Sequence, residues 1–145
     1  MVAVTSNTFL LTVMELQSTQ RRLSAELNSM STAAAPEALR EQLRSLRADV
    51  VQHLDQKDSF YDKLLSLAHQ HDDAETERFM LKTAAEMKAQ SQRVRRFFYD
   101  LDSMGAQVAA TIFRKLEPGI QRRFETELQS TFPLAVRTAC MSKRA

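Results

Sequence analysis

A long stripe of core-type residues in the middle of the chain does most to limit the folds open to it. Its members follow one another at alternating steps of four and three: Leu39, Leu43, Leu46, Val50, His53, Lys57, Phe60, Leu64 and Leu67. This heptad spacing keeps the stripe on one face of a continuous helix. A second row runs beside it: Val51, Leu54, Tyr61, Leu65 and Ala68. Two adjacent rows can contact two neighbours, so we expect this helix to lie at the centre of a bundle.

Turn-forming residues are scarce throughout the chain. Its 145 residues include two glycines, Gly105 and Gly119, and three prolines. Sheets need frequent turns built from such residues, so their scarcity favours a few long helices. The length fits one domain, since domains usually hold about 100–200 residues. We therefore predict a single all-α domain over residues 1–145, an antiparallel, coiled-coil-like bundle of three helices, or four with an extra N-terminal helix.

The first two helices have clear beginnings. Thr, Ser and Asn side chains at positions 5–8 can cap a helix, and apolar residues then follow at helical spacing. We place this N-terminal helix at about residues 6–31. Pro36 suits the first position of the next helix, where its missing N–H needs no partner. The central helix then runs from about Pro36 to Gln70, as the first arm of a core hairpin over about residues 36–116.

The second half of the chain contains glycines and prolines that make its helix ends harder to place. The expected stripe of the third helix is Met80, Ala84, Met87, Ser91, Val94, Phe98, Leu101, Val108 and Ile112. Because this spacing continues across Gly105, it favours one helix that runs past the glycine. The Pro-Gly pair at positions 118–119 predicts a break. A C-terminal helix should follow at about residues 119–141, with a kink or restart at Pro133.

No residue pattern in the chain indicates catalysis or a bound cofactor. Phosphate-binding glycine loops, metalloprotease helices and nucleophile elbows have known spacings, and none of these occurs. Residues 69–73 (HQHDD) contain metal-ligand types, but helical residues two apart point in nearly opposite directions. His53 lies on the core stripe, where we expect a hydrogen-bonded structural role. We therefore expect no enzyme activity, no cofactor and no metal.

The charges of the chain are nearly balanced. Its 20 basic and 18 acidic residues give a net charge of +2, too little for a protein that binds nucleic acid by neutralising phosphates. Arg93, Arg95 and Arg96 lie beside an aromatic cluster, a group more typical of a solvated or protein-facing surface. No segment approaches the about 20 apolar residues that cross a bilayer. With a single cysteine, Cys140, we expect a cytoplasmic protein that binds neither nucleic acid nor membranes.

Lys57 is the one lysine on the central stripe. Its long stem would let it bury methylene groups and carry its ammonium group outward to water. Alternatively, it would mark a place where the bundle is open to an acidic partner. The residues alone leave both interpretations open.

Two stretches of the chain carry a resemblance to a known family. Val50–Lys63 (VVQHLDQKDSFYDK) has a valine pair, a leucine and then an aromatic–acid–lysine group. It resembles the first helix of the tubulin-binding cofactor A family. Gln92–Leu101 (QRVRRFFYDL) is similar to the end of that family's second helix. The matched region covers about residues 43–102, with a capped acidic turn between the two stretches.

The resemblance implies both a function and a set of contact residues. Members of the family are small helical bundles that hold β-tubulin before the αβ-tubulin heterodimer assembles, without nucleotide, metal or catalysis. Carried over by position, the resemblance implicates Gln52, Tyr61, Lys63, Gln92, Arg93 and Tyr99. Basic Lys57, Arg95 and Arg96 join this expected partner-binding set, because they complement the charge of acidic β-tubulin. The implied location is the cytoplasm, in association with the cytoskeleton.

A second function from a different class fits the same helices. The chain would be a helical chaperone or adaptor of a secretion or vesicle-tethering system, whose partner lays an amphipathic helix in a groove. Heptad stripes also often self-associate, so a homodimer is a further expectation.

Overall fold

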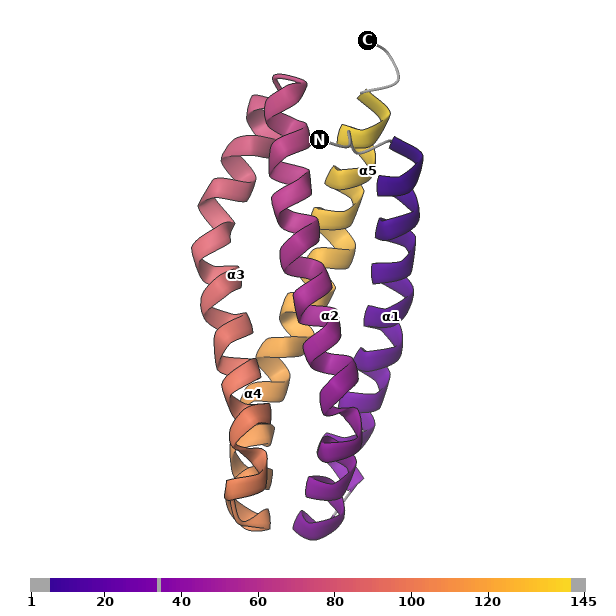
Figure 1. Ribbon diagram of the computed structural model, residues 1–145. Coiled ribbons are helices and arrows are strands. Elements are labelled where there is room, and N and C mark those ends of the chain that lie inside the picture. Colours follow the sequence, from indigo (N-terminus) through magenta and orange to yellow (C-terminus); the bar gives the residue numbers. More distant parts are fainter. Residues whose placement is uncertain (1–5, 34, 142–145) are drawn as a thin grey trace.

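The computed structural model describes residues 6–33 and 35–141, and this part of the chain is an all-α bundle of four antiparallel rods (Figure 1). The elements are α1 (Ser6–Ala33), α2 (Pro36–Gln70), α3 (Ala74–Asp100), a 3₁₀ turn (Leu101–Ser103), α4 (Ala106–Thr126), a π-helical segment (Glu127–Thr131) and α5 (Phe132–Met141). The fourth of these rods is one nearly continuous helix that consists of α4, the π-helical segment and α5. The fold class and the bounds of the first two helices agree with the predictions.

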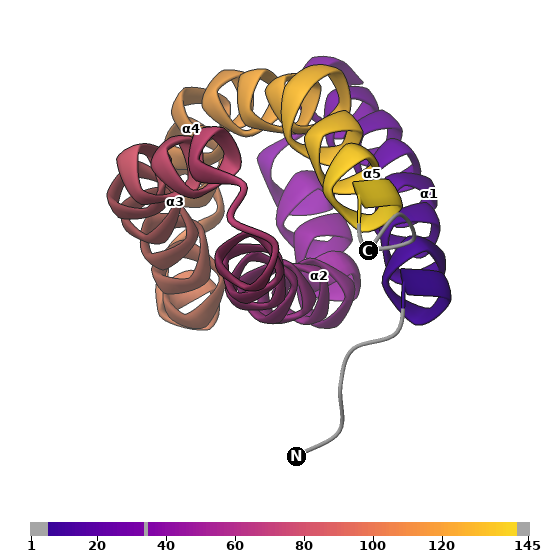
Figure 2. The ribbon, with the colours of Figure 1, turned by 90° about the horizontal axis from the view of Figure 1, so that it is seen from above.

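Helix α2 is the spine of the bundle. It packs against α1, α3, α4 and α5, and the view along the bundle shows it beside both α1 and α3 (Figure 2). All nine members of its heptad stripe are buried. From the second row, Leu54 and Ala68 are buried and the other three are partly buried. The predicted central position of this helix is confirmed, because two buried rows give it neighbours on two sides.

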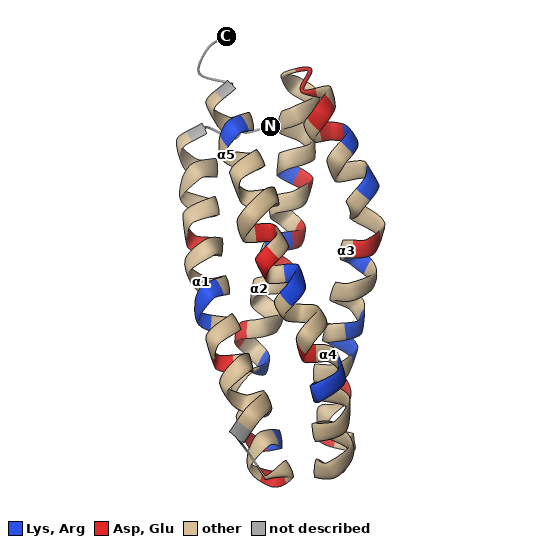
Figure 3. Ribbon diagram, turned by 180° about the vertical axis from the view of Figure 1, so that it is seen from behind, with Lys and Arg blue, Asp and Glu red and all other residues tan. Residues whose placement is uncertain are grey.

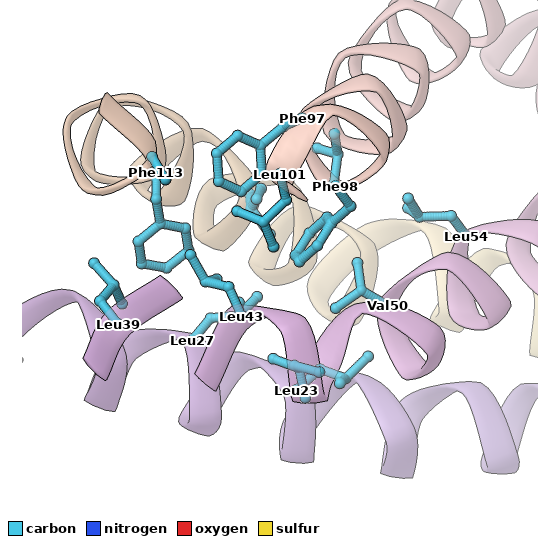
Figure 4. Packing of buried hydrophobic residues seen from close by; sticks show 14 of the residues in the cluster. Leu23, Leu27, Leu39, Leu43, Val50, Leu54, Phe97, Phe98, Leu101 and Phe113 are labelled. Atoms are coloured by element: carbon cyan, nitrogen blue, oxygen red, sulfur yellow. The ribbon is translucent and has the colours of Figure 1, made fainter. Parts of the chain in front are cut away.

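The apolar core falls into two clusters, one toward each end of the bundle. In the first, Leu43 and Val50 of α2 face Phe98 of α3 (Figure 4). In the second, the ring of Phe60 from α2 lies between two rings from other helices. Its centroid is 5.3 Å from that of Phe9 in α1 and 5.7 Å from that of Phe132 in α5. Polar side chains occupy the middle of the bundle between these clusters.

The expected helix across Gly105 is wrong, because the chain reverses there. Helix α3 ends at Asp100, and Gly105 precedes α4 with an extended backbone (ψ 154°). The predicted hairpin arm to residue 116 is therefore two helices. Since the turn changes the register, Val108 and Ile112 are 52% and 36% exposed, while Phe113 takes the buried position.

Arginines of α2 hold this turn in place. Arg40 donates to the carbonyl oxygen of Met104 at 3.0 Å. Arg44 and Arg47 both donate to the carboxylate of Asp102, at 2.8 and 3.0 Å. The three arginines are spaced four and three residues apart, so they lie on one face of α2 and reach the turn together. The local sequence around Gly105 carries no sign of this support.

The opposite end of α3 is fixed by a polar contact with α5. Asp73 caps α3, accepting a hydrogen bond from the Thr76 backbone N–H at 3.2 Å. Its other carboxylate oxygen accepts from the hydroxyls of Thr76 and Thr138, at 2.6 and 3.2 Å. Helix α3 is thus tied to the bundle at both ends.

The break expected at Pro118 is also wrong. Helix α4 continues through the proline, whose side chain is exposed, so the carbonyl group that loses its amide partner can face water. Phe113, Ile120 and Phe124 lie on both sides of this position and are all buried. Their packing against the core holds the helix together across the proline.

Replacing Pro118 with alanine should stabilise the fold. A proline inside a helix costs about 3 kcal/mol relative to alanine. The greater freedom of the unfolded alanine chain offsets about 1 kcal/mol of that gain. We expect Pro118→Ala to raise the free energy of unfolding by about 2 kcal/mol, measured by urea denaturation. A lower or unchanged stability would show that α4 needs the proline in order to bend.

The expected restart at Pro133 is confirmed. The chain forms a π-helical segment just before it, in which the amide of Phe132 donates to the carbonyl oxygen of Glu127. A wider turn suits this place, because Pro133 has no N–H for the carbonyl group four residues earlier and its ring would crowd that group. The segment buries Glu127 and Thr131 before α5 begins.

Candidate functional site

The residues implicated by the resemblance lie on three different faces of the bundle. Tyr61, Gln92 and Arg95 come together in a groove of about 480 Å³ on the outside of the α2–α3 hairpin. Lys63 lies instead in a groove beside Thr12 and Glu15 of α1. Gln52 is exposed and eleven residues before Lys63, so it belongs to the same side of α2. Arg93 lines a third groove, between α3 and α4.

The hairpin groove combines a fixed charge cluster with apolar walls. Arg95 donates to Asp55 and Asp58 of α2, at 2.8 and 2.7 Å, which ties the two helices together. The Tyr61 hydroxyl is buried and has no hydrogen-bond partner among the described residues. Leu81 at the rim is 60% exposed.

An exposed row on α3 continues this face beyond the groove. Gln92, Arg96 and Tyr99 follow one another at steps of four and three, so they lie on one side of the helix. Tyr99 is 69% exposed, a high value for an aromatic ring. We call the hairpin groove together with this row the hairpin face. It holds five of the nine expected partner-binding residues: Tyr61, Gln92, Arg95, Arg96 and Tyr99.

Of the two interpretations of Lys57, the one in which its ammonium group reaches water is wrong. The residue is 4% exposed, and its ammonium group donates to the Glu127 carboxylate at 2.8 Å. The ammonium also lies 4.5 Å from the centre of the Phe124 ring, a cation–π distance. The acidic partner of this lysine is therefore inside its own chain.

Lys57 and Glu127 belong to a buried polar layer, which we define as Gln20, His53, Lys57 and Glu127. The Gln20 amide nitrogen donates to the carbonyl oxygen of Phe124 at 2.9 Å, so the amide oxygen faces His53. The His53 Nε2 atom, 2.9 Å from that oxygen, is therefore the protonated nitrogen. The prediction that His53 is hydrogen-bonded inside the core is confirmed.

Burial shifts the pKa values of this layer toward the neutral forms. Loss of water lowers the pKa of Lys57, and the Glu127 carboxylate opposes that shift. Loss of water likewise raises the pKa of Glu127, against the opposing effect of Lys57. Burial, with help from the positive charges of Lys57 and Arg22, lowers the pKa of His53 to about 3. The imidazole is thus neutral at pH 7.

A cavity beside the layer offers little room for a ligand. It measures about 30 Å³, and its lining combines apolar side chains with the polar or charged residues His53, Lys57, Gln90, Ser91, Arg123 and Glu127. That volume suits about one or two water molecules. The buried His53 Nδ1 and Glu127 Oε2 atoms lack hydrogen-bond partners among the described residues, so both can accept a hydrogen bond from a water molecule there. The layer therefore fits a structural role in the core better than substrate binding.

The neutral state of His53 should make stability depend on pH. The unfolded imidazole binds a proton near pH 6.5, whereas the folded one does so only near pH 3. Stability is therefore lost as the pH falls below the unfolded value, by roughly 3 kcal/mol between pH 7 and pH 4 from this residue. Urea unfolding at each pH measures the slope of the free energy of unfolding against pH. His53→Gln should remove the share of this slope that comes from the imidazole. Equal slopes in both chains would contradict this assignment.

Sequence reasoning missed Glu127 and the importance of Gln20. A signal for Glu127 existed, since it follows the buried Ile120 and Phe124 at steps of four and three, although Leu128 looked like the natural core residue. A lysine on a core stripe requires a buried acid, because an isolated buried charge is too costly.

Residues 6–33 and 35–141 also bear on metal binding and on membrane insertion. This part of the chain contains no group of three or more His, Cys, Asp or Glu side chains placed to hold a metal ion. None of the helices in this part has the length and apolar character needed to span a membrane. Comparison of the chain with protein-family models, curated proteins and solved structures finds no significant match.

Proposed function

We propose that the chain is a non-catalytic chaperone or adaptor that binds a partner protein through the hairpin face. The observation that carries this proposal is the meeting of Tyr61, Gln92 and Arg95, from two helices, in one surface groove. Exposed Leu81 and Tyr99 add the apolar and aromatic area on which protein interfaces depend. The groove lies over two helices that Arg95, Asp55 and Asp58 join.

β-Tubulin is the partner to test first, as a tubulin-folding cofactor of the A type would hold it before heterodimer assembly. Support for this partner comes from the resemblance of the two stretches that form the hairpin. Arg96 on the hairpin face, together with Lys88 in the groove, would attract an acidic partner. The associated location would be the cytoplasm, with the cytoskeleton.

Binding of purified β-tubulin by isothermal titration tests the proposal. The wild-type chain should bind, and Arg96→Glu combined with Tyr99→Ala should weaken binding at least ten-fold, the effect expected of an aromatic anchor and a nearby charge. Leu11→Ala is the control, because Leu11 is an exposed apolar residue on α1, away from the hairpin face. If the folded wild-type chain does not bind β-tubulin, this assignment of the partner is wrong.

The adaptor for an amphipathic helix is the second candidate function. A different surface favours it, namely the groove between α3 and α4. A secretion or vesicle-tethering partner would supply the helix.

A further inference from the structure

The groove between α3 and α4 is a surface left open by the way α3 is attached. Helix α3 is tied down at its ends, by Asp73 to α5 and through the turn to α2. Between these ends the groove has a volume of about 580 Å³. Its walls are the α3 residues Phe79, Thr83, Glu86, Ala89, Gln90 and Arg93, and the α4 residues Gly119, Arg122, Arg123 and Thr126. An adjoining hollow of about 240 Å³ adds Lys115 and Leu116.

The groove has the pattern of a helix-docking surface. On α4, Val108, Ile112, Lys115, Gly119 and Arg122 follow one another at alternating steps of four and three. This is heptad spacing on the outer side of the helix, parallel to the buried stripe. Two of its members are exposed apolar residues, Val108 at 52% and Ile112 at 36%. They extend the wall of the groove toward the α3–α4 turn.

Small residues line the middle of the groove. Gly119 has no side chain, and the nearest atoms to a Cβ built there are 3.6 and 3.9 Å away, at Gln90 and Arg122. Ala89 and Thr83 face the same space from α3. Small residues at such a position let another helix approach closely. Partly exposed Phe79 and Leu116 provide apolar contacts toward the two ends.

Four of the five charged side chains around the groove are basic, and among them Arg123 lies 3.9 Å from a Glu127 carboxylate oxygen. Arg93, Lys115 and Arg122 have no acid within ion-pair distance in the part of the chain that the structure describes. One Nη atom of Arg123 is buried without a hydrogen-bond partner among these residues. The one acidic side chain on the walls is Glu86. Figure 3 shows Lys and Arg positions on both α3 and α4 on this side of the bundle.

Other arginines of the chain contrast with this group. Arg44, Arg47 and Arg95 each have a carboxylate at 2.7–3.0 Å on another helix or turn. These three arginines are paired with acids of neighbouring elements, whereas Arg93, Lys115 and Arg122 along the α3–α4 groove have no such pair among the described residues. Burial lowers the pKa of Arg123, and the Glu86 carboxylate opposes that shift.

We propose that the α3–α4 groove binds an acidic amphipathic helix of another protein. The helix lies along the heptad stripe of α4, with its apolar residues over Val108, Ile112 and Leu116. Its acidic side chains face Lys115, Arg122 and Arg93. The stripe from Val108 to Arg122 spans 14 residue steps, or about 21 Å at 1.5 Å per step, so an occupant needs about four helical turns. This inference rests on the second candidate function, the adaptor for an amphipathic helix, and not on the hairpin face or on β-tubulin.

The test uses a designed peptide, an 18-residue helix with leucines at heptad spacing and glutamates beside them. Its matched control has lysine in place of every glutamate. Fluorescence anisotropy should show that the acidic peptide binds the full chain at least ten-fold more tightly than the basic one. Added salt should weaken the binding, because exposed charge pairs are screened.

Variants on α4 locate the binding. Arg122→Glu should weaken binding of the acidic peptide at least ten-fold. Arg21→Glu makes the same charge reversal at an exposed position of α1 and should change the affinity less than two-fold. Gly119→Leu fills the groove and replaces a helix-interior glycine by a good helix former, so binding should be lost without loss of stability. Both variants should keep β-tubulin binding at the hairpin face, which separates a failure here from a failure of the proposed function.

Three results would overturn the proposal. The first is an acidic peptide that does not bind, or binds no better than the basic peptide. The second is Arg122→Glu and Gly119→Leu chains that bind as the wild type does. The third is that the wild-type chain forms a dimer in analytical ultracentrifugation and the Gly119→Leu chain does not. A second copy of the chain would then occupy the groove.

Discussion

Lys57→Met is expected to lower the free energy of unfolding by about 3–5 kcal/mol, because it leaves Glu127 buried without its cation. Glu127 is 1% exposed, and the Lys57 ammonium at 2.8 Å is its close partner. Arg123 is farther away, with 3.9 Å between its Nε and a Glu127 oxygen. Without Lys57, the carboxylate must either keep an uncompensated charge or take up a proton.

The double variant Lys57→Met/Glu127→Leu should recover most of this loss. Replacing a buried ion pair by apolar residues of similar volume is often neutral, or stabilising by about 1–4 kcal/mol. Urea denaturation of both single variants and the double variant measures the coupling. Lys63→Met is the control, since Lys63 is exposed on the same helix, and it should change stability by less than about 0.5 kcal/mol.

The pH dependence of the single variant adds a second readout. Burial already raises the pKa of Glu127, and removal of Lys57 raises it further. The folded Lys57→Met chain then binds a proton at a pH where the unfolded chain does not, so lowering the pH through that range increases the stability relative to wild type. If the single variant is as stable as wild type at every pH, the buried ion pair is not present in solution.

Phe60→Ala is expected to destabilise the chain by about 3–5 kcal/mol, the usual cost of removing a buried phenylalanine ring. Phe60 is 1% exposed, and its ring contacts Phe9 and Phe132 at 5.3 and 5.7 Å between centroids. These contacts join α1, α2 and α5. Because α5 is a short helix held by this packing, its amides should lose protection from hydrogen exchange before those of α2 do.

An exposed aromatic residue provides the comparison for this prediction. Tyr99→Ala removes a ring that is 69% exposed, so stability should change by less than about 0.5 kcal/mol. A loss below about 2 kcal/mol for Phe60→Ala would mean that the rings are not packed as described.

The sequence was most informative where one strong periodicity acted alone. The stripe from Leu39 to Leu67 has no glycine or proline within it, so heptad spacing determined both the extent and the burial of α2. Pro36 marked its beginning correctly, because the proline suits the first turn of a helix.

Local signals misled where a tertiary contact decided the outcome. Gly105 looked tolerable inside a periodic helix, but the turn there is held by arginines from α2 that lie about 60 residues earlier in the chain. Pro118 looked like a break, but buried residues on both sides keep α4 continuous. In both places the contacts that determine the backbone come from other helices, so local sequence could not show them.

The candidate sites also depend partly on local sequence and partly on contacts between helices. Tyr61 and Gln92 were expected together from the resemblance, and they do share a groove, whereas Lys63 and Arg93 lie on other faces. The distribution of these residues depends on how α2 is rotated against its neighbours. The α3–α4 groove was hidden in the sequence, because Val108 and Ile112 were read as core residues of a continuous helix.

Hydrogen–deuterium exchange of the chain with and without β-tubulin tests most directly the claim that the hairpin face binds a partner protein. We expect slower exchange in α2 and α3 around Tyr61 and residues 92–99, and unchanged exchange in α1. Binding that leaves the hairpin face unprotected, or that protects α1 instead, would contradict the proposed function.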